Sequence, residues 1–238
     1  MKKKPVRGPQ QTFFYRLVAF FSKFQLSYLY RRHRHRDLIT ILYLFFSGMV
    51  ALGTITLMAF LTNLMLLFPP LGPSAFILFY TPLSEAASPR NLILSHTVAL
   101  LSGLGALTLS QTLFPAFIET APTAMNWPHL LAIVLAMGTV SLGMVLIRCV
   151  HPPAAATALI AAMGYLDSLI QIGGVLLAVL LLAMEACLFN RLLGGLPYPV
   201  WRFDPKIEKT FRSLAGHPAF TETRWQKLAQ KTFHRRQA

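Results

Sequence analysis

The chain has 238 residues, of which 55% are hydrophobic and only 13% are charged, and its formal net charge is +14 at pH 7. A soluble domain carries charge on roughly a quarter of its residues, so this composition excludes an ordinary soluble protein. Of 22 Lys and Arg residues, ten precede Asp37 and ten lie at or after Arg191. We therefore expect a polytopic membrane protein whose basic tails contact anionic lipid headgroups rather than nucleic acid.

The N-terminal arm, residues 1–37, is basic throughout. Apolar residues recur at helical spacing over 13–30, which predicts an amphipathic helix lying in the membrane interface. A helix that covers the cytoplasmic face without entering the membrane is the alternative. The Arg and His run at 31–36 then marks the cytoplasmic surface, and we interpret His33 and His35 as solvated rather than metal-binding.

No charged side chain occurs in the 47 residues from Leu38 to Ser84. As one helix this stretch would be roughly 70 Å long, about twice the thickness of a bilayer core. It must therefore cross the membrane twice, or cross once and re-enter. We place the first span at 38–61, where small residues permit close helix contact.

The remaining elements are predicted from apolar runs, prolines and caps. Ser88 and Pro89 are a suitable cap and first-turn pair for a helix. In chain order we expect a short helix at 72–80, a loop at 81–90, a helix at 91–114, a loop at 115–128, a helix at 129–150, a short helix at 154–163, a turn at Asp167, a span at 169–193 and a basic cytoplasmic tail at 194–238.

Two stretches resemble each other at a constant offset of 83 residues, namely 68–77 and 151–160. In both stretches a proline pair at the second and third positions, a small residue, a hydroxyl residue, Ala and Ile fall in register. Two adjacent prolines cannot lie inside a helix, but a new helix can begin after them. The sequence therefore predicts two helix breaks, each followed by a half-helix, in two repeats at about 38–114 and 128–193.

Basic residues at both ends favour an even number of crossings with both termini cytoplasmic, in the cell (inner) membrane. Four crossings with two re-entrant hairpins would place loop 115–128, which has no Lys or Arg, in the cytoplasm. Six crossings would instead place Arg90, Arg148 and Arg191 inside, and would make the repeats inverted. We favour six crossings, in which extended backbone and a half-helix together complete a span.

Several motifs resemble the HPP family of integral membrane proteins, which is named for its His-Pro-Pro motif and described as four-spanning. They are Gly-Pro-Ser-Ala at 72–75, Ala-Ser-Pro-Arg-Asn at 87–91, Ser-His at 95–96 and His-Pro-Pro-Ala-Ala-Ala-Thr-Ala at 151–158. The resemblance covers roughly residues 38–193. It implies an all-α polytopic membrane protein, with four long transmembrane helices and two short proline-initiated half-helices. It also implies a transporter, with nitrite as the substrate attributed to some photosynthetic members.

The chain departs from that family pattern at three positions. Pro73 replaces an alanine, and Ser95 and Ala155 each replace a glycine. The two glycine replacements alter how closely the backbone can approach a substrate, so the identity of the substrate does not follow from the resemblance.

The N-termini of the two half-helices are the predicted binding site. Unpaired N–H groups and the positive end of a helix dipole attract an anion, and transporters with inverted repeats use such broken helices. Ser74 and Thr157 either add hydroxyl donors to this site or bond their own helix carbonyls. The candidate substrate-binding residues are His151, Pro152, Pro153, Ala154, Thr157, Gly72, Ser74, Arg90 and His96.

Three histidines lie in or near the apolar segments. His151 sits at the second break, where it could couple a proton to anion movement or bond a carbonyl freed by the prolines. His96 is expected to face the same pocket, or else to lie at the interface. We interpret His129, which follows Pro128 at a helix start, as structural.

Few charged side chains lie in the central region. Arg90 falls in a helix first turn, where the helix dipole disfavours a cation, so a substrate anion, lipid phosphate or topology must favour it. Glu185 is expected inside the last span, with Arg148 as its partner. Cys149 and Cys187 read as small buried hydrophobes.

We expect no enzymatic activity, no cofactor and no metal, because no catalytic or metal-ligand spacing is present. Two alternatives remain for the function: a channel, or a non-transporting membrane scaffold or regulatory protein. An intramembrane enzyme that uses His96, His129 and His151 is a further alternative, and a homo-oligomer stays open.

Overall fold

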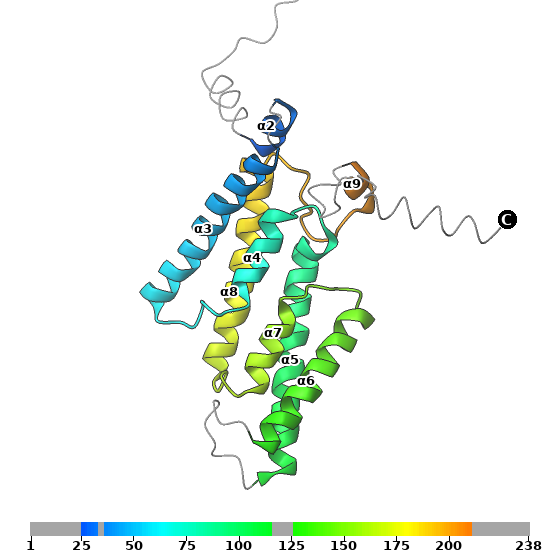
Figure 1. The fold of residues 1–238 in the computed structure, drawn as a ribbon. Helices are drawn as coiled ribbons and strands as arrows, with labels where there is room; N and C mark the ends of the chain where they lie inside the picture. The colour runs from blue at the N-terminus through cyan, green and yellow to red at the C-terminus, as the bar shows by residue number, and fades with distance from the viewer. Residues whose placement is uncertain (1–24, 33–35, 116–125, 211–238) are drawn as a thin grey trace, which may run out of the picture.

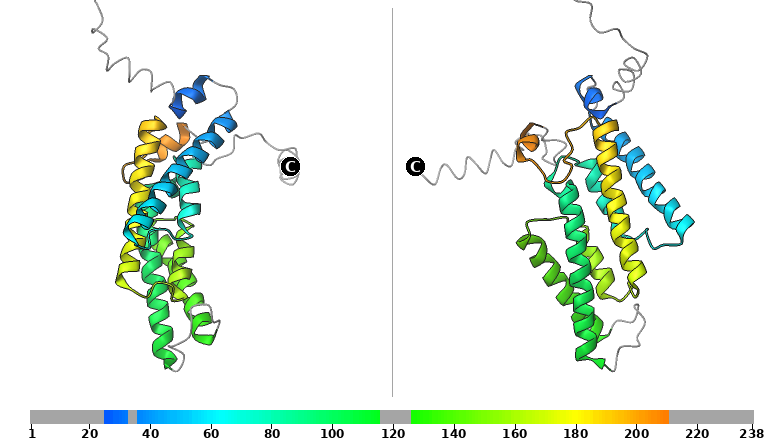
Figure 2. Two further views of the ribbon diagram at one scale, coloured as in Figure 1. Left: turned by 90° about the vertical axis from the view of Figure 1, so that its left-hand side faces the viewer. Right: turned by 180° about the vertical axis from the view of Figure 1, so that it is seen from behind.

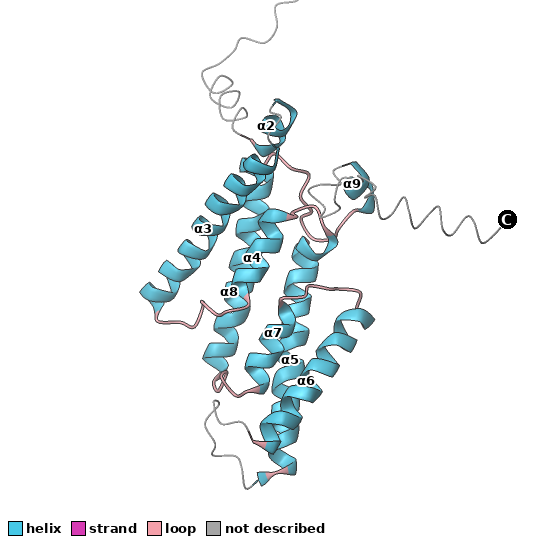
Figure 3. Cartoon of the chain, in the orientation of Figure 1, coloured by secondary structure: helices cyan, strands magenta, loops and turns pink. Residues whose placement is uncertain are grey.

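A computed structural model describes residues 25–32, 36–115 and 126–210 (Figure 1). Most of the predicted interfacial helix, His33, His35, most of loop 115–128 and most of the C-terminal tail lie outside the described residues. Every regular element in the described part is a helix, as Figure 3 shows. The all-α prediction is therefore confirmed.

Four helices are long and apolar enough to cross a membrane: α3 (Arg36–Thr62), α5 (Pro89–Leu113), α6 (Trp127–Leu146) and α8 (Leu169–Leu188). Three of them, α5, α6 and α8, begin directly after a residue whose side chain caps the helix. The side chains of Ser88, Asn126 and Ser168 each accept a hydrogen bond from the backbone N–H three residues later. These caps satisfy N–H groups that a helix start otherwise leaves unpaired.

One predicted boundary is wrong. Helix α6 ends at Leu146 rather than near residue 150, because Arg148 takes a left-handed conformation with φ 52°. A left-handed residue cannot continue a right-handed helix. The last span does reach residue 193, but α8 ends at Leu188 and a π-helical turn, η3 (Phe189–Leu193), completes it.

Both proline pairs begin short helices, as predicted. Helix α4 spans Leu71–Tyr80 and helix α7 spans Ala154–Ala162. Each follows non-helical backbone, residues 63–68 before α4 and the connection after α6 before α7. Proline at the start of each helix supplies a suitable φ, and the small apolar residues that follow favour helix.

One end of the bundle, which we call the α2 end, gathers both described ends of the chain. Leu26 of α2 (Leu26–Arg32) packs with Leu83, which follows α4, and with Leu196, which follows α8. Tyr198 donates to the Ala87 carbonyl in the short helix η1 (Glu85–Ala87). Burial raises the pKa of Tyr198 well above its usual value, so its hydroxyl stays protonated as the donor. In Figure 2, α2 and α9 (Pro205–Thr210) lie at this same end.

The opposite end, which we call the Asp167 end, is formed by the end of α5, the start of α6 and the connection from α7 to α8. The Met65 backbone, just after α3, contacts Gly174 near the start of α8, so α3 also ends toward this side. Within the described residues the direction of the chain reverses from each helix to the next between α3 and α8, and residues 63–80 and 147–162 contain the two broken segments (Figure 1).

Helix α5 lies between two groups of buried residues. Its Leu92 and Leu100 join a core with α3, α4 and α8, whereas its Ala99 and Ala106 join a second core with α6 and α7. This position places one face of α5 against each half-helix, which is where the candidate site forms.

Candidate functional site

The two helix breaks lie side by side. An open apolar groove of about 680 Å³ is lined by Gly72, Pro73, Phe76 and Ile77 from the first break and by Pro152 and Pro153 from the second. Segments 83 residues apart in the sequence therefore start their half-helices next to each other. The shared location that the repeated pattern predicted is present in the structure.

His96 of α5 connects the two half-helices beneath this groove. Its Nε2 lies 3.2 Å from the Ser74 hydroxyl of α4, and its Nδ1 lies 2.8 Å from the Thr157 hydroxyl of α7. His96 and Ser74 are fully buried and Thr157 is 1% exposed. The imidazole also packs edge-on against Phe68, with ring centroids 6.0 Å apart.

His151 completes the cluster from the second break. Its Nδ1 lies 2.8 Å from the Ala86 carbonyl oxygen and its Nε2 lies 2.9 Å from the Ser74 hydroxyl. The ring is fully buried, and its centroid is 5.5 Å from that of His96. His96 thus faces this cluster and does not lie at the interface. His151 bonds a carbonyl, as its structural alternative predicted, and also contacts the predicted site.

The backbone N–H groups at the two half-helix starts are paired, so the prediction of unpaired donors is wrong. At α4 the N–H groups of Leu71, Gly72 and Ser74 donate to carbonyls of residues 68–70. At α7 the N–H groups of Ala154, Ala155 and Ala156 donate to carbonyls of residues 151–153. The reason is that each proline pair forms a tight turn, whose carbonyls lie three or four residues before the donors.

Arg90 is held by the broken end of α6. Its two terminal nitrogens donate to the carbonyls of Ile147 and Arg148, at 3.1 and 3.0 Å. Neighbouring side chains on α5 bind the next two carbonyls, because Ser95 donates to Cys149 at 2.6 Å and Asn91 to Val150 at 3.4 Å. The carbonyl end of a helix carries partial negative charge, which accounts for a cation at this position without a substrate.

Glu185 does not pair with Arg148, contrary to the sequence-based expectation. One carboxyl oxygen of Glu185 on α8 bonds the Thr54 hydroxyl on α3, and the other is buried without a partner among the described residues. Arg148 is exposed on a different part of the bundle. The reason is that Glu185 faces α3 whereas Arg148 follows α6, and α3 and α6 lie at opposite edges of the bundle (Figure 1).

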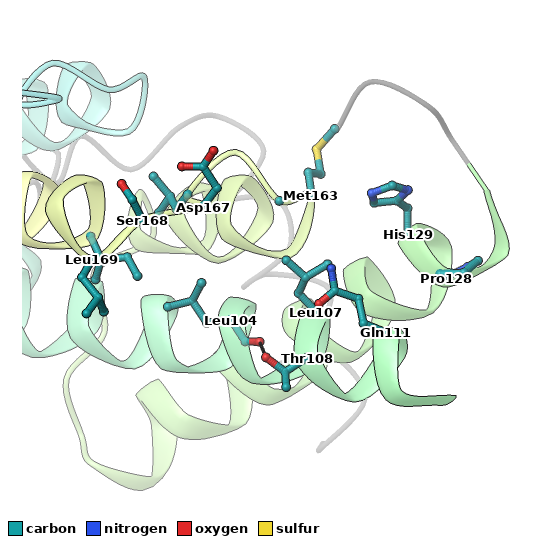
Figure 4. Close-up of a pocket in the computed structure, with 13 residues that line it drawn as sticks. Leu104, Leu107, Thr108, Gln111, Pro128, His129, Met163, Asp167, Ser168 and Leu169 are labelled. Carbon is teal, nitrogen blue, oxygen red and sulfur yellow. Dashed lines mark hydrogen bonds between the residues drawn. The ribbon is translucent and has the colours of Figure 1, made fainter. Parts of the chain in front are cut away.

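A second cavity, of about 560 Å³, lies at the Asp167 end (Figure 4). Thr108 and Gln111 of α5, His129 of α6 and Asp167 are among its lining residues, and no Lys or Arg is among them in the described structure. His129 bonds Asn126, its own helix cap, at 2.9 Å, which agrees with a structural role. A cavity with a carboxylate and no fixed cation is unsuited to an anion.

The described residues contain no group of three or more His, Cys, Asp or Glu side chains placed to hold a metal ion. Cys149 is buried and Cys187 is partly buried, both as free thiols.

Sequence reasoning missed three members of the site. The Ala86 carbonyl has no sequence signal, because any residue could supply it. Ser95 was noticed only as a departure at a glycine position, yet its hydroxyl binds the break at Cys149. Phe68 occupies the position in the first repeat that His151 occupies in the second, and this equivalence was the available signal for its contact with His96.

The family description "HPP, transmembrane region" matches residues 33–199, which include every element of the site. The chain belongs to the HPP family. No curated protein and no solved structure matches it. Membership of the HPP family agrees with the apolar helices and makes this an integral membrane protein. The His-Pro-Pro motif contributes the buried His151 and the turn that begins α7.

Proposed function

We propose that this HPP-family chain is an integral membrane transporter of a small inorganic anion such as nitrite, which binds where α4 and α7 begin. The supporting observation is the buried polar cluster of Ser74, His96, His151 and Thr157 between the two half-helices. Ionisable groups inside a membrane protein are costly to bury and usually serve function. This cluster lies in the core and contributes four hydrogen-bonding side chains.

The electrostatics of the cluster suit a transient anion. Each half-helix N-terminus carries a partial positive charge of roughly half an elementary charge. The guanidinium of Arg90 is already bound to two carbonyls, and Arg148 is exposed. Since the backbone N–H groups are also paired, a side chain of the cluster would contact the anion by exchanging one of its internal hydrogen bonds, while the helix dipoles add attraction. The absence of a strong permanent countercharge lets the anion leave.

The arrangement also supports alternating access by an inverted repeat. In Figure 1, α6, α7 and α8 run in the reverse sense to α3, α4 and α5. Phe68 and His151, at equivalent positions of the two repeats, both pack against His96. Transporters built this way bind substrate where broken helices meet. Full burial of both histidines favours a carrier with a closed site over an open channel.

The basic residues before Asp37 and after Arg191 favour cytoplasmic termini in the inner membrane, with anionic lipids at both tails and no nucleic-acid partner. This orientation puts the α2 end, and with it the nearby histidine cluster, closer to the cytoplasm.

The direct test is flux of nitrite, nitrate and chloride into liposomes that contain the purified protein. We expect wild-type protein to move at least one of these anions. His151→Ala should lower flux by about tenfold or more, the usual scale for loss of a hydrogen bond to a charged group. His129→Ala is the matched control, because among the described residues its imidazole bonds only Asn126, the cap of its own helix.

Absence of flux for all tested anions would contradict the proposal and favour a scaffold. Normal flux in His151→Ala, with insertion and folding intact, would remove the cluster from the transport site. Pro153→Ala should damage both folding and flux, because it converts the break toward continuous helix.

A further inference from the structure

The hydrogen bonds of the histidine cluster form one continuous chain. It runs from Thr157 through His96, Ser74 and His151 to the Ala86 carbonyl, with successive distances of 2.8, 3.2, 2.9 and 2.8 Å. Each link joins a different helix or connection, so the chain passes from α7 to α5, α4 and the second break. Because the side chains are buried, water does not compete for these bonds.

The Ala86 carbonyl decides where the protons lie. A carbonyl only accepts, so Nδ1 of His151 carries a proton. In a neutral ring Nε2 is then an acceptor, and Ser74 must donate to it. Ser74 has one proton, so His96 donates to Ser74 from its own Nε2. Nδ1 of His96 is left as the acceptor of the Thr157 hydroxyl. With both rings neutral, every bond therefore points from Thr157 toward Ala86.

Ser74 has a second acceptor within reach. Its hydroxyl oxygen lies 2.9 Å from the Pro70 carbonyl oxygen, at the start of α4. The single Ser74 proton can point fully to Pro70 or to His151, but not to both. If His151 binds a proton at Nε2, that nitrogen becomes a donor, and Ser74 must turn its proton to Pro70. The Ser74 hydroxyl is thus a two-position element whose state follows the charge of His151.

We propose that His151 takes up one proton with each anion transported, so that the protein is a proton–anion symporter with Ser74 as the switch. This inference rests on the proposed transport function. Hydronium from the aqueous phase gives its proton to Nε2 of His151 and leaves water, while Ser74 rotates and no other covalent bond changes. Release reverses both steps.

Burial is what couples the proton to the anion. An imidazolium inside an apolar core is costly without a countercharge, and so is an anion. Each ion lowers the cost of the other, so the two bind together and leave together. The 5.5 Å separation of the imidazole rings makes two charges on the pair unfavourable. One proton per anion is therefore the expected ratio.

None of the titratable or charged side chains near His151 in the described structure replaces it as the residue that binds the proton. The titratable and charged side chains on the elements packed around it are His96 and Arg90 on α5, Glu85 on η1, Tyr80 at the far end of α4, Arg148 and Cys149 before the second break, and Tyr198 after α8; α7 has none. Glu85, Tyr80 and Arg148 are exposed. Tyr198 is a neutral donor to the Ala87 carbonyl and Arg90 is a cation bound to carbonyls, so neither supplies a negative charge to offset a protonated His151.

Two measurements test the proposal. The first uses liposomes of phosphatidylcholine and phosphatidylglycerol with the membrane voltage clamped by potassium and valinomycin, nitrate as the probe and a pH dye inside. An acidic exterior should speed nitrate entry and acidify the interior. Ser74→Ala should reduce this pH-driven entry by about tenfold or more, since His151 then loses its partner at Nε2. Ser110→Ala is the control and should retain pH-driven entry, because it removes a buried hydroxyl on α5 that donates to the Pro128 carbonyl, outside the cluster.

The second measurement needs no transport. Nitrogen-15 histidine NMR of the protein in bilayers should show opposite tautomers at neutral pH, with the proton on Nδ1 in His151 and on Nε2 in His96. The signals are assigned by their loss in His96→Gln and His151→Gln. The reverse tautomer for His151 would overturn the switch.

The outcomes separate the two proposals. Nitrate flux that ignores the pH gradient and carries no protons would overturn symport alone and leave anion transport standing. No flux of nitrate, nitrite or chloride would overturn transport and symport together. Flux that is pH-driven in wild type and in Ser74→Ala alike would remove Ser74 from the mechanism and overturn the proposed switch.

Discussion

A cation in the first turn of a helix opposes the dipole of that helix, and Arg90 shows how another helix can compensate. Its guanidinium bonds two carbonyls at the end of α6, so the unfavourable end of one dipole is offset by the favourable end of another. Ser95 and Asn91 extend the same contact along the broken backbone. Arg90 therefore holds the second break in position beside the histidine cluster.

Replacing Arg90 by Met should lower the free energy of unfolding by about 2 kcal/mol, because two charged hydrogen bonds to α6 carbonyls are lost. Arg90→Lys should cost less, since it keeps the charge but not the paired geometry. Thermal unfolding in detergent measures the change in stability for both variants. Arg148→Gln is the control, because it changes an exposed arginine and should shift the free energy of unfolding by at most about 0.5 kcal/mol. Unchanged stability with lost flux in Arg90→Met would return Arg90 to substrate binding.

The half-helices depend on close packing against α5. A Cβ added to Gly103 would meet the Ala158 carbonyl oxygen at 2.4 Å and the Ala161 Cβ at 2.6 Å, both on α7. One of these atoms is backbone and the other is the rigidly held Cβ of an alanine, so no flexible side chain can move aside. Because His96 lies two turns earlier on α5, this contact fixes the distance between His96 and Thr157.

Gly103→Ala should therefore destabilise the protein by about 1–3 kcal/mol through overpacking. Gly105→Ala is the matched control in the same helix, because nothing lies within 4 Å of its added Cβ. Its better helix propensity should make it neutral or stabilising by roughly 0.5–1 kcal/mol. Equal unfolding temperatures for the two variants would contradict the α5–α7 contact.

At the scale of the whole molecule, the four long helices and the two short helices alternate in direction from α3 to α8, which is the arrangement that six crossings require. Contacts of Leu26, Leu83 and Leu196 bring the start of the bundle, the loop after α4 and the segment after α8 to one end. A four-crossing arrangement with re-entrant hairpins would leave the loop after α4 at the opposite end.

Site-directed labelling measures this topology. In a background with Cys149 and Cys187 replaced by Ala, Asp204→Cys should react with an impermeant thiol reagent only from the cytoplasmic side. Glu85→Cys, in the loop after α4, should also react only from the cytoplasmic side, whereas four crossings with re-entrant hairpins would expose it on the other side. Glu85 and Asp204 are both exposed, so accessibility within the protein does not limit either reaction. Labelling of Glu85→Cys only from the non-cytoplasmic side would rule out six passes across the membrane.

The sequence alone determined the helices and the two breaks, because their causes are local. Proline lacks an N–H wherever the chain folds, so the pairs ending at Pro70 and Pro153 interrupt helix in any context. Ser88 caps a helix by a contact three residues away. A periodic apolar pattern needs no knowledge of its partners. The end of α6 was misplaced because the left-handed turn at Arg148 depends on contacts with α5.

The site was only partly predictable from the sequence. The equivalence of Ser74 and Thr157 indicated a common location, and His96 was a candidate, but their bonds required the positions of three helices. Only the tertiary structure decided that Glu185 meets Thr54, that His151 bonds the Ala86 carbonyl, and that the half-helix N–H groups are paired. Such contacts join backbone and side chains distant in the sequence, and a pattern of residue types does not specify them.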